Sequence, residues 1–171
     1  DIHKFRVEVK CLRSFLRLLN MDMCTSQFKL PKKFKALYDI AGEIRQAQLE
    51  TDTLKKRELP FPTYQQHLQN IISDKRKEWK KRYSKTIIKG FEDEFTSALP
   101  AKLQYDTLTG FFGTCLKEIN SILMVEPDND QIHSYRKRIK DMLYLAKIAA
   151  DYWAGGYKTL SKFPLKQLDH L

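Results

Sequence analysis

Apolar side chains recur every three or four residues along most of the chain, and this spacing predicts helices. In residues 2–20, Phe5, Val9, Leu16 and Leu19 fall on one side of such a helix. At roughly 100° per residue, the histidine and the cations of this stretch fall within an arc of about 80° on the other side. They are His3, Arg6, Lys10, Arg13 and Arg17. The pattern predicts an amphipathic helix with a basic ladder.

The same spacing predicts further helices at 31–56, 73–99 and 105–124, and one that ends at Ala154 before Gly155 and Gly156. We expect Asp128 or Asp130 to be the N-cap of that last helix, and another helix to begin at Pro164. Pro60 and Pro62 interrupt the chain, which makes them the best candidates for an internal boundary. Gly42 lies inside a predicted helix, and close approach of a neighbouring helix is a reason for it.

The first ladder returns near the other end of the chain. The histidine helix that ends at Ala154 repeats the order of a histidine, an arginine and a lysine at the same spacing. Its ladder consists of His133, Arg136, Lys137, Lys140 and Lys147. Lys-Leu-Pro at 29–31 and Lys-Phe-Pro at 162–164 extend the repeat. We therefore expect one domain over 1–171 that contains a half-repeat at 1–72 and an incomplete half-repeat at 73–171, cut off part-way through its last helix in a longer protein.

Charge narrows the class of ligand. The chain has 171 residues, with 31 Lys plus Arg against 21 Asp plus Glu, and a formal net charge of +10. Such a charge attracts nucleic acid, acidic membrane or a phosphate polymer. With only six glycines, the composition favours an all-α protein, and no apolar run is long enough for a membrane span. Repeated stripes with almost no interleaved acids favour a polyanion site over a merely solvated helix face.

The sequence offers little for catalysis or for cofactors. The three cysteines, Cys11, Cys24 and Cys115, are odd in number and far apart, which is typical of reduced thiols in a cytoplasmic protein. We find no nucleophile motif, no carboxylate cluster for a metal and no glycine-rich phosphate loop. We therefore expect a non-enzymatic protein without a cofactor.

Three sequence segments resemble a known family. HKFRVEVKCLR and HSYRKRIKDMLY resemble the two signature helices of the CHAD domain, the conserved histidine α-helical domain, and LYDIAGEIRQAQ resembles the helix after the first signature. The resemblance implies two antiparallel helical bundles related by a pseudo-twofold axis, with terminal helices truncated here. It also implies binding of inorganic polyphosphate by a localising or scaffolding module, with polyphosphate-metabolising enzymes as partners and polyphosphate granules as a location.

Residue by residue, the family pattern and the ladders together give one candidate set. Arg45 takes the basic place after Gly42, while Cys11, Gln46 and Leu143 depart from the pattern. The predicted polyphosphate-binding residues are His3, Arg6, Lys10, Arg13, Arg17, Arg45, His133, Arg136, Lys137, Lys140 and Lys147. Arginine contributes a planar fork for two phosphate oxygens, and lysine a mobile point charge.

Several alternatives remain open. Each histidine either bonds a neighbouring helix, contacts phosphate, ligates a metal or forms a phosphohistidine, in decreasing order of preference. RNA is a second polyanion that would explain the charge, and Tyr135, Tyr144 or Trp153 would then stack on bases. An accessory domain of a phosphate-metabolising enzyme is a third function. Competition between polyphosphate and nucleic acid separates the first two, and phosphate release with magnesium tests for an enzyme.

Overall fold

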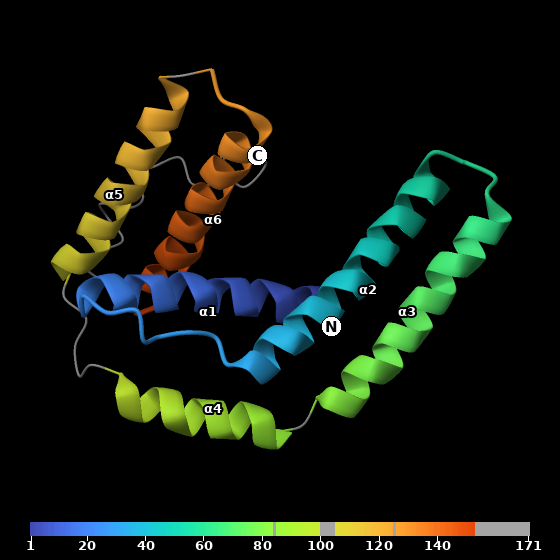
Figure 1. The fold of residues 1–171 in the computed structure, drawn as a ribbon, viewed down its shortest axis with the longest axis horizontal. Helices are drawn as coiled ribbons and strands as arrows, with labels where there is room; N and C mark the ends of the chain where they lie inside the picture. The colour runs from blue at the N-terminus through green and yellow to red at the C-terminus, as the bar shows by residue number, and fades with distance from the viewer. Residues whose placement is uncertain (84, 100–104, 125, 153–171) are drawn as a thin grey trace. The chain divides into compact units, whose positions relative to one another are not determined.

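The structure, a computed structural model, describes residues 1–83, 85–99, 105–124 and 126–152. Within these residues the chain forms six helices and no strand, which confirms the predicted all-α class (Figure 1). The expected glycine stop at Gly155 and the helix at Pro164 lie outside the described residues. The helices are α1 (Ile2–Asp22), α2 (Lys32–Lys56), α3 (Pro62–Arg82), α4 (Lys85–Ala98), α5 (Tyr105–Leu123) and α6 (Asn129–Tyr152).

Contacts divide the chain into two compact units. Unit 1 comprises Asp1–Val9 and Leu30–Pro100, and unit 2 comprises Lys10–Lys29 and Ala101–Leu171. Helix α1 therefore contributes its first residues to unit 1 and the rest to unit 2. The half-repeats at 1–72 and 73–171, and a pseudo-twofold relation between them, stay predictions.

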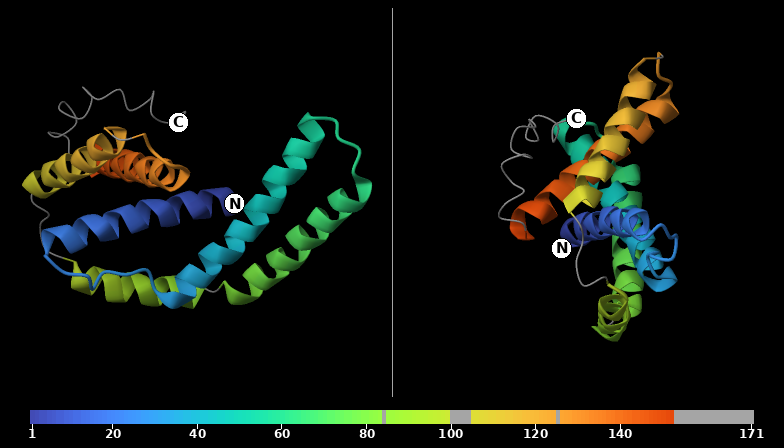
Figure 2. Two further views of the ribbon diagram at one scale, coloured as in Figure 1. Left: turned by 45° about the horizontal axis from the view of Figure 1, so that its top comes forward. Right: turned by 90° about the vertical axis from the view of Figure 1, so that its left-hand side faces the viewer.

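An antiparallel hairpin of α2 and α3 dominates unit 1 (Figures 1 and 2). Ala47 and Leu54 from α2 and Leu68 from α3 are buried together between the helices. Nearer the other end, Lys75 on α3 lies 2.8 Å from the carboxylate of Glu43 on α2. Pro60 and Pro62 belong to the connection inside this hairpin, where Pro62 begins α3 and loses no helical hydrogen bond.

The predicted long helix at 73–99 is wrong, because the chain breaks between α3 and α4. Tyr83 is extended, with ψ at 120°, and its N–H donates to Trp79 O at 2.8 Å as α3 ends. Because the helix breaks, Trp79 of α3 and Phe91 of α4 can join one aromatic cluster. The Phe5 ring lies 5.6 Å from Trp79 and 6.4 Å from Phe34, which lies 5.2 Å from Phe91. An unbroken helix would hold Trp79 and Phe91 about 18 Å apart along its axis.

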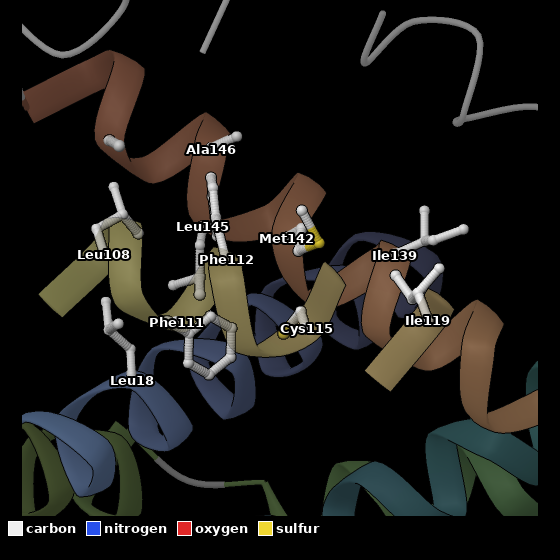
Figure 3. Close-up of a cluster of buried hydrophobic side chains, with 11 residues drawn as sticks. Leu18, Leu108, Phe111, Phe112, Cys115, Ile119, Ile139, Met142, Leu145 and Ala146 are labelled. Carbon is white, nitrogen blue, oxygen red and sulfur yellow. The ribbon is translucent and has the colours of Figure 1, made fainter. Parts of the chain in front are cut away.

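Unit 2 has a continuous apolar core. Residues of α5 and α6 face each other along a second antiparallel hairpin, and Leu18 of α1 packs against them (Figure 3). The buried cluster comprises Leu18, Leu108, Phe111, Phe112, Cys115, Ile119, Ile139, Met142, Leu145, Ala146 and Ala149. Because α1 continues from this core toward residue 1, the core holds the second half of the first ladder in place.

Helix ends follow local chemistry. The Gln131 N–H donates to Asp128 Oδ1 at 2.7 Å, and the Asp128 N–H donates to Gln131 Oε1 at 3.0 Å. This reciprocal pair is a capping box. It confirms Asp128 as the N-cap of α6, shortly before His133 of the second ladder. Pro31, expected at the first helical position of α2, is instead its N-cap.

Candidate functional site

In unit 1 the ladder residue Arg6 lies against the backbone of α2. Its Nη1 donates a hydrogen bond to Tyr38 O at 3.0 Å. The guanidinium carbon lies 4.4 Å from the centre of the Tyr38 ring, a cation–π contact. Both partners are electrically neutral, so Arg6 keeps its net charge while its position is fixed.

Gly42 makes this contact sterically accessible. A Cβ at position 42 would lie 2.6 Å from Arg6 Nη1, which is closer than real contacts allow. The close approach predicted for Gly42 is confirmed, and the neighbour is a side chain of α1. Arg45 is one turn further along the same line of α2 and is half-buried. In unit 1, the Arg6 side chain therefore lies against the face of α2 that also carries Arg45.

In unit 2 the ladder residue Arg17 has a different environment. Its Nη2 forms an ion pair with Asp141 Oδ1 on α6, and Asp141 also accepts a hydrogen bond from Ser14 Oγ at 2.7 Å. Asp141 is 6% exposed and Ser14 is 0% exposed. The Arg17 Nε is buried and finds no acceptor in the described part of the chain. Asp141 thus cancels the charge of Arg17 locally.

Sequence reasoning missed Asp141 and Ser14. Asp141 follows Lys140 directly, and on a helical projection it lies at the edge of the apolar face of α6 rather than on the ladder. A carboxylate beside an apolar face is a signal for a buried partner, because an unpaired buried charge is costly. The sequence gives no indication, however, of which cation on another helix supplies that partner.

The Ser14–Asp141 contact joins the two ladders of unit 2. Ser14 lies one turn after Lys10 on α1, and its single hydroxyl proton is shared between Asp141 and Lys10 O, which lies 3.1 Å from Ser14 Oγ. Asp141 lies next to Lys140 on α6. The structure therefore brings the α1 residues Lys10, Arg13 and Arg17 beside the α6 ladder. His3, Arg6 and Arg45 belong to unit 1.

Most of the α6 ladder faces solvent. His133, Arg136, Lys137 and Lys147 are exposed, and Lys140 is half-buried. In the described residues, the side chains of Arg136, Lys137 and Lys147 have no carboxylate within ion-pair distance, whereas Arg138, off the ladder, pairs with Glu118 of α5. Cations one turn apart, at roughly 5.4 Å spacing, match a ligand with repeated negative charges.

The imidazole rings of both ladder histidines face solvent. The imidazoles of His3 and His133 are exposed, and neither makes a hydrogen bond or ring contact with the described part of the protein. The backbone N–H of His3 donates to Asp1 Oδ1 at 2.8 Å. The described ranges contain no group of three His, Cys, Asp or Glu side chains that would hold a metal ion. The geometry leaves both rings available to a ligand.

Burial strongly raises the pKa of the Cys115 thiol. The apolar surroundings of Cys115 raise its pKa from 9.0 to about 11, with a smaller lowering by Arg138. Cys115 belongs to the core below the Ser14–Asp141 contact, and the charges of Asp141 and Arg17 also act on it, in opposite directions. Cys11, Cys24 and Cys115 are free thiols. Buried and protonated, Cys115 is a structural residue, not a nucleophile.

Comparisons with known proteins add the family. Among the described helices, none is long and apolar enough to cross a bilayer. Comparison with curated proteins and with solved structures gave no match. A family model does match: residues 1–171 correspond to the CHAD domain, in agreement with the ladders at His3 and His133. The chain is therefore a member of the CHAD domain family.

Proposed function

We propose that this protein binds inorganic polyphosphate through the basic ladders of α1 and α6 and acts as a non-catalytic localising or scaffolding module. The observation that carries the proposal is the row of exposed cations on α6, Arg136, Lys137 and Lys147, none of which forms an ion pair within the described residues. The Ser14–Asp141 contact holds this row beside Lys10 and Arg13 of α1. Family membership is the second support.

A linear phosphate polymer suits this surface better than a compact ligand does. Polyphosphate carries about one negative charge per phosphate, so many weak contacts along a row combine into tight binding and release counterions, as in nucleic-acid binding. The exposed α6 row would contribute the most mobile contacts, while Arg6, fixed on Tyr38, would contribute a preset one. The exposed imidazoles of His3 and His133 would donate hydrogen bonds to phosphate oxygens.

The non-catalytic role and the cytoplasmic location are part of the same proposal. Free thiols at Cys11, Cys24 and Cys115 suit a reducing compartment. Polyphosphate granules and polyphosphate-metabolising enzymes would be its surroundings there. Phosphate release from polyphosphate with added magnesium would contradict the non-catalytic role.

The test uses two variants of equal charge. The ladder variant is Arg136→Gln/Lys137→Gln/Lys147→Gln, and the control variant is Lys33→Gln/Lys55→Gln/Lys56→Gln, which removes three exposed cations of α2. Binding of long-chain polyphosphate is measured by calorimetry for both variants and the wild type, with single-stranded RNA as competitor. Circular dichroism checks that helicity is retained.

We expect the ladder variant to lose at least tenfold in affinity and the control variant to lose less than threefold, because only the first removes direct contacts. We expect RNA at equal charge to displace little polyphosphate. Equal losses in the two variants would show that net charge alone attracts the polymer. Efficient displacement by RNA would assign the surface to nucleic acid instead.

A further inference from the structure

Helix α3 carries a third row of polar and basic side chains, separate from both ladders. Gln69, Ser73, Arg76 and Lys80 follow one another at helical spacing, within an arc of about 60° at 100° per residue. All four are exposed. At 1.5 Å rise per residue, the row extends for roughly 16 Å along unit 1.

The charges of this row are uncompensated, unlike those of its neighbours. Lys75 is paired with Glu43 and Glu78, and Arg82 is paired with Glu78. Glu78 of α3 is therefore paired with cations outside the row. The side chains of Arg76 and Lys80 make no ion pair or hydrogen bond with the described residues, and the same holds for the side chains of Gln69 and Ser73.

The row borders a hollow in the surface. The hollow has a volume of about 420 Å³ and is lined by Gln69, Ile72, Ser73, Arg76, Lys77 and Lys80. Lys77 pairs with Asp74 at 3.4 Å, and both side chains are highly exposed, so water screens this pair and leaves the ammonium group accessible. Ile72 packs against the buried side chains between α2 and α3, which anchors the floor of the hollow.

We propose that this face of α3 is a second anion site, which binds a linear oligophosphate. Arg76 and Lys80, one turn apart, would each hold a phosphate group, and Lys77 would add a third cation at the rim. The amide of Gln69 and the hydroxyl of Ser73 would donate to the phosphate at the other end of the row. A single orthophosphate reaches only one rung, so the site favours chains of several phosphates. No residue of the α1 and α6 ladders takes part.

Nuclear magnetic resonance with inorganic tripolyphosphate tests this site. Backbone amide shifts are followed on titration of the wild type, of Arg76→Gln/Lys80→Gln, and of the control Lys55→Gln/Lys56→Gln, which removes two exposed cations of the same unit. Orthophosphate at equal ionic strength is a parallel titration. Amides of α6 report the proposed ladder site in the same spectra.

We expect tripolyphosphate to shift amides of residues 69–80, with a dissociation constant that rises at least tenfold in the double variant and less than twofold in the control. Orthophosphate should produce shifts only at concentrations at least tenfold higher. Absence of shifts at 69–80, or an equal loss in both variants, would overturn this inference. Because the shifts of α6 amides are recorded separately, the α3 site and the α6 ladder site are tested independently of each other.

Discussion

Arg6 and Arg17 belong to the same basic row of α1 but have opposite environments. Arg6 is held by a carbonyl and an aromatic ring, both neutral, beside a glycine. Arg17 is held by the carboxylate of Asp141, which is nearly buried. Both arginines are positioned by a neighbouring helix, yet only Arg6 keeps a net charge to offer to an anion. A row of cations in sequence therefore overstates the charge of the folded surface.

The difference also separates two ways to build the same ladder. A neutral contact costs little desolvation, and its geometry depends on the absence of a Cβ at Gly42. A contact with a buried carboxylate links two helices firmly, but it removes one cation from ligand binding.

The apolar core of unit 2 should strongly slow the reaction of Cys115 with thiol reagents. With the pKa of Cys115 at about 11 instead of 9.0, its thiolate fraction near pH 8 is about a hundredfold lower. Labelling by a thiol reagent is compared between Cys11→Ser/Cys24→Ser, which retains Cys115, and Cys11→Ser/Cys115→Ser, which retains exposed Cys24. We expect at least a hundredfold slower labelling of Cys115, since burial also blocks access.

The pH dependence has a definite sign. The folded protein disfavours the Cys115 thiolate, so the stability contributed by the neutral thiol is fully present below pH 9 and is lost as pH rises toward 11. Labelling of Cys115 should accelerate over the same interval. Equal labelling rates for Cys115 and Cys24 at pH 8 would mean that the core under Asp141 is open.

Replacement of the buried acid should separate stability from binding. Asp141→Asn weakens the bonds to Arg17 and Ser14, and we expect a loss of about 2 kcal/mol in the free energy of unfolding. The same change frees the charge of Arg17, so polyphosphate affinity should rise roughly twofold to fivefold. Urea denaturation and calorimetry measure the two effects.

Glu126→Gln is the matched control for Asp141→Asn. Glu126 is an exposed acid of unit 2, and its removal changes the net charge equally without touching Arg17. We expect a change of less than 0.5 kcal/mol in stability. If Asp141→Asn weakened polyphosphate binding in a protein that is still folded, Asp141 would position the ladder more than it neutralises Arg17.

The effect of Gly42→Ala on the free energy of unfolding should change sign when Arg6 is replaced. In the wild type, the new Cβ displaces the Arg6 guanidinium from Tyr38, and we expect a net loss of about 1 kcal/mol despite better helix propensity. With Arg6→Ala already present, the same substitution should stabilise by about 0.5–1 kcal/mol. Urea denaturation of the four proteins gives the coupling energy.

Gly90→Ala provides the reference for Gly42→Ala. Gly90 is an exposed glycine of α4, and a Cβ there meets nothing within 4 Å. Its substitution should stabilise equally with and without Arg6. A Gly42→Ala effect that is also independent of Arg6 would contradict the close contact between the two residues.

The smallest change in polyphosphate affinity is expected when Arg17 and Asp141 are both replaced. Arg17→Leu/Asp141→Asn leaves the local charge unchanged, so polyphosphate affinity should change less than about twofold. Arg136→Gln/Glu126→Gln is also charge-balanced but removes an exposed ladder cation, and its affinity should fall several-fold. Calorimetry compares the two double variants. A larger loss for the Arg17 pair would make Arg17 a ligand-binding residue after all.

Local features of the structure were predictable from the sequence. The positions of α1, α2, α5 and α6, the Asp128 cap and the close approach at Gly42 follow from apolar spacing and from the chemistry of single residues. The start of α3 was not predicted, since α3 begins at Pro62 and the expected helix began at Ser73. The break after Tyr83 was not predictable, because aromatic residues every four positions also fit one straight helix. The break accompanies a tertiary cluster around Phe5 and Phe34 that local spacing does not encode.

The basic rows of α1 and α6 were recognised from the sequence, but the ion pair that neutralises Arg17 was not. The ladders were found because cations recur at helical spacing, and the α6 row is exposed as expected. The pairing of Arg17 with Asp141 joins residues far apart in the chain, so no local pattern reveals it. The sequence also did not show that Arg76 and Lys80 lack an ion pair within the described residues, because it does not reveal which lysines of α3 find acids on α2.

The dependence of polyphosphate binding on salt tests the central claim most directly. If Arg136, Lys137 and Lys147 each contact a phosphate, the slope of log K against log salt should become about 2 units shallower in their triple glutamine variant, at about 0.7 per contact. The Lys33→Gln/Lys55→Gln/Lys56→Gln control should retain the slope of the wild type. An unchanged slope in the ladder variant, or the same decrease in both variants, would contradict binding of polyphosphate by the α6 ladder.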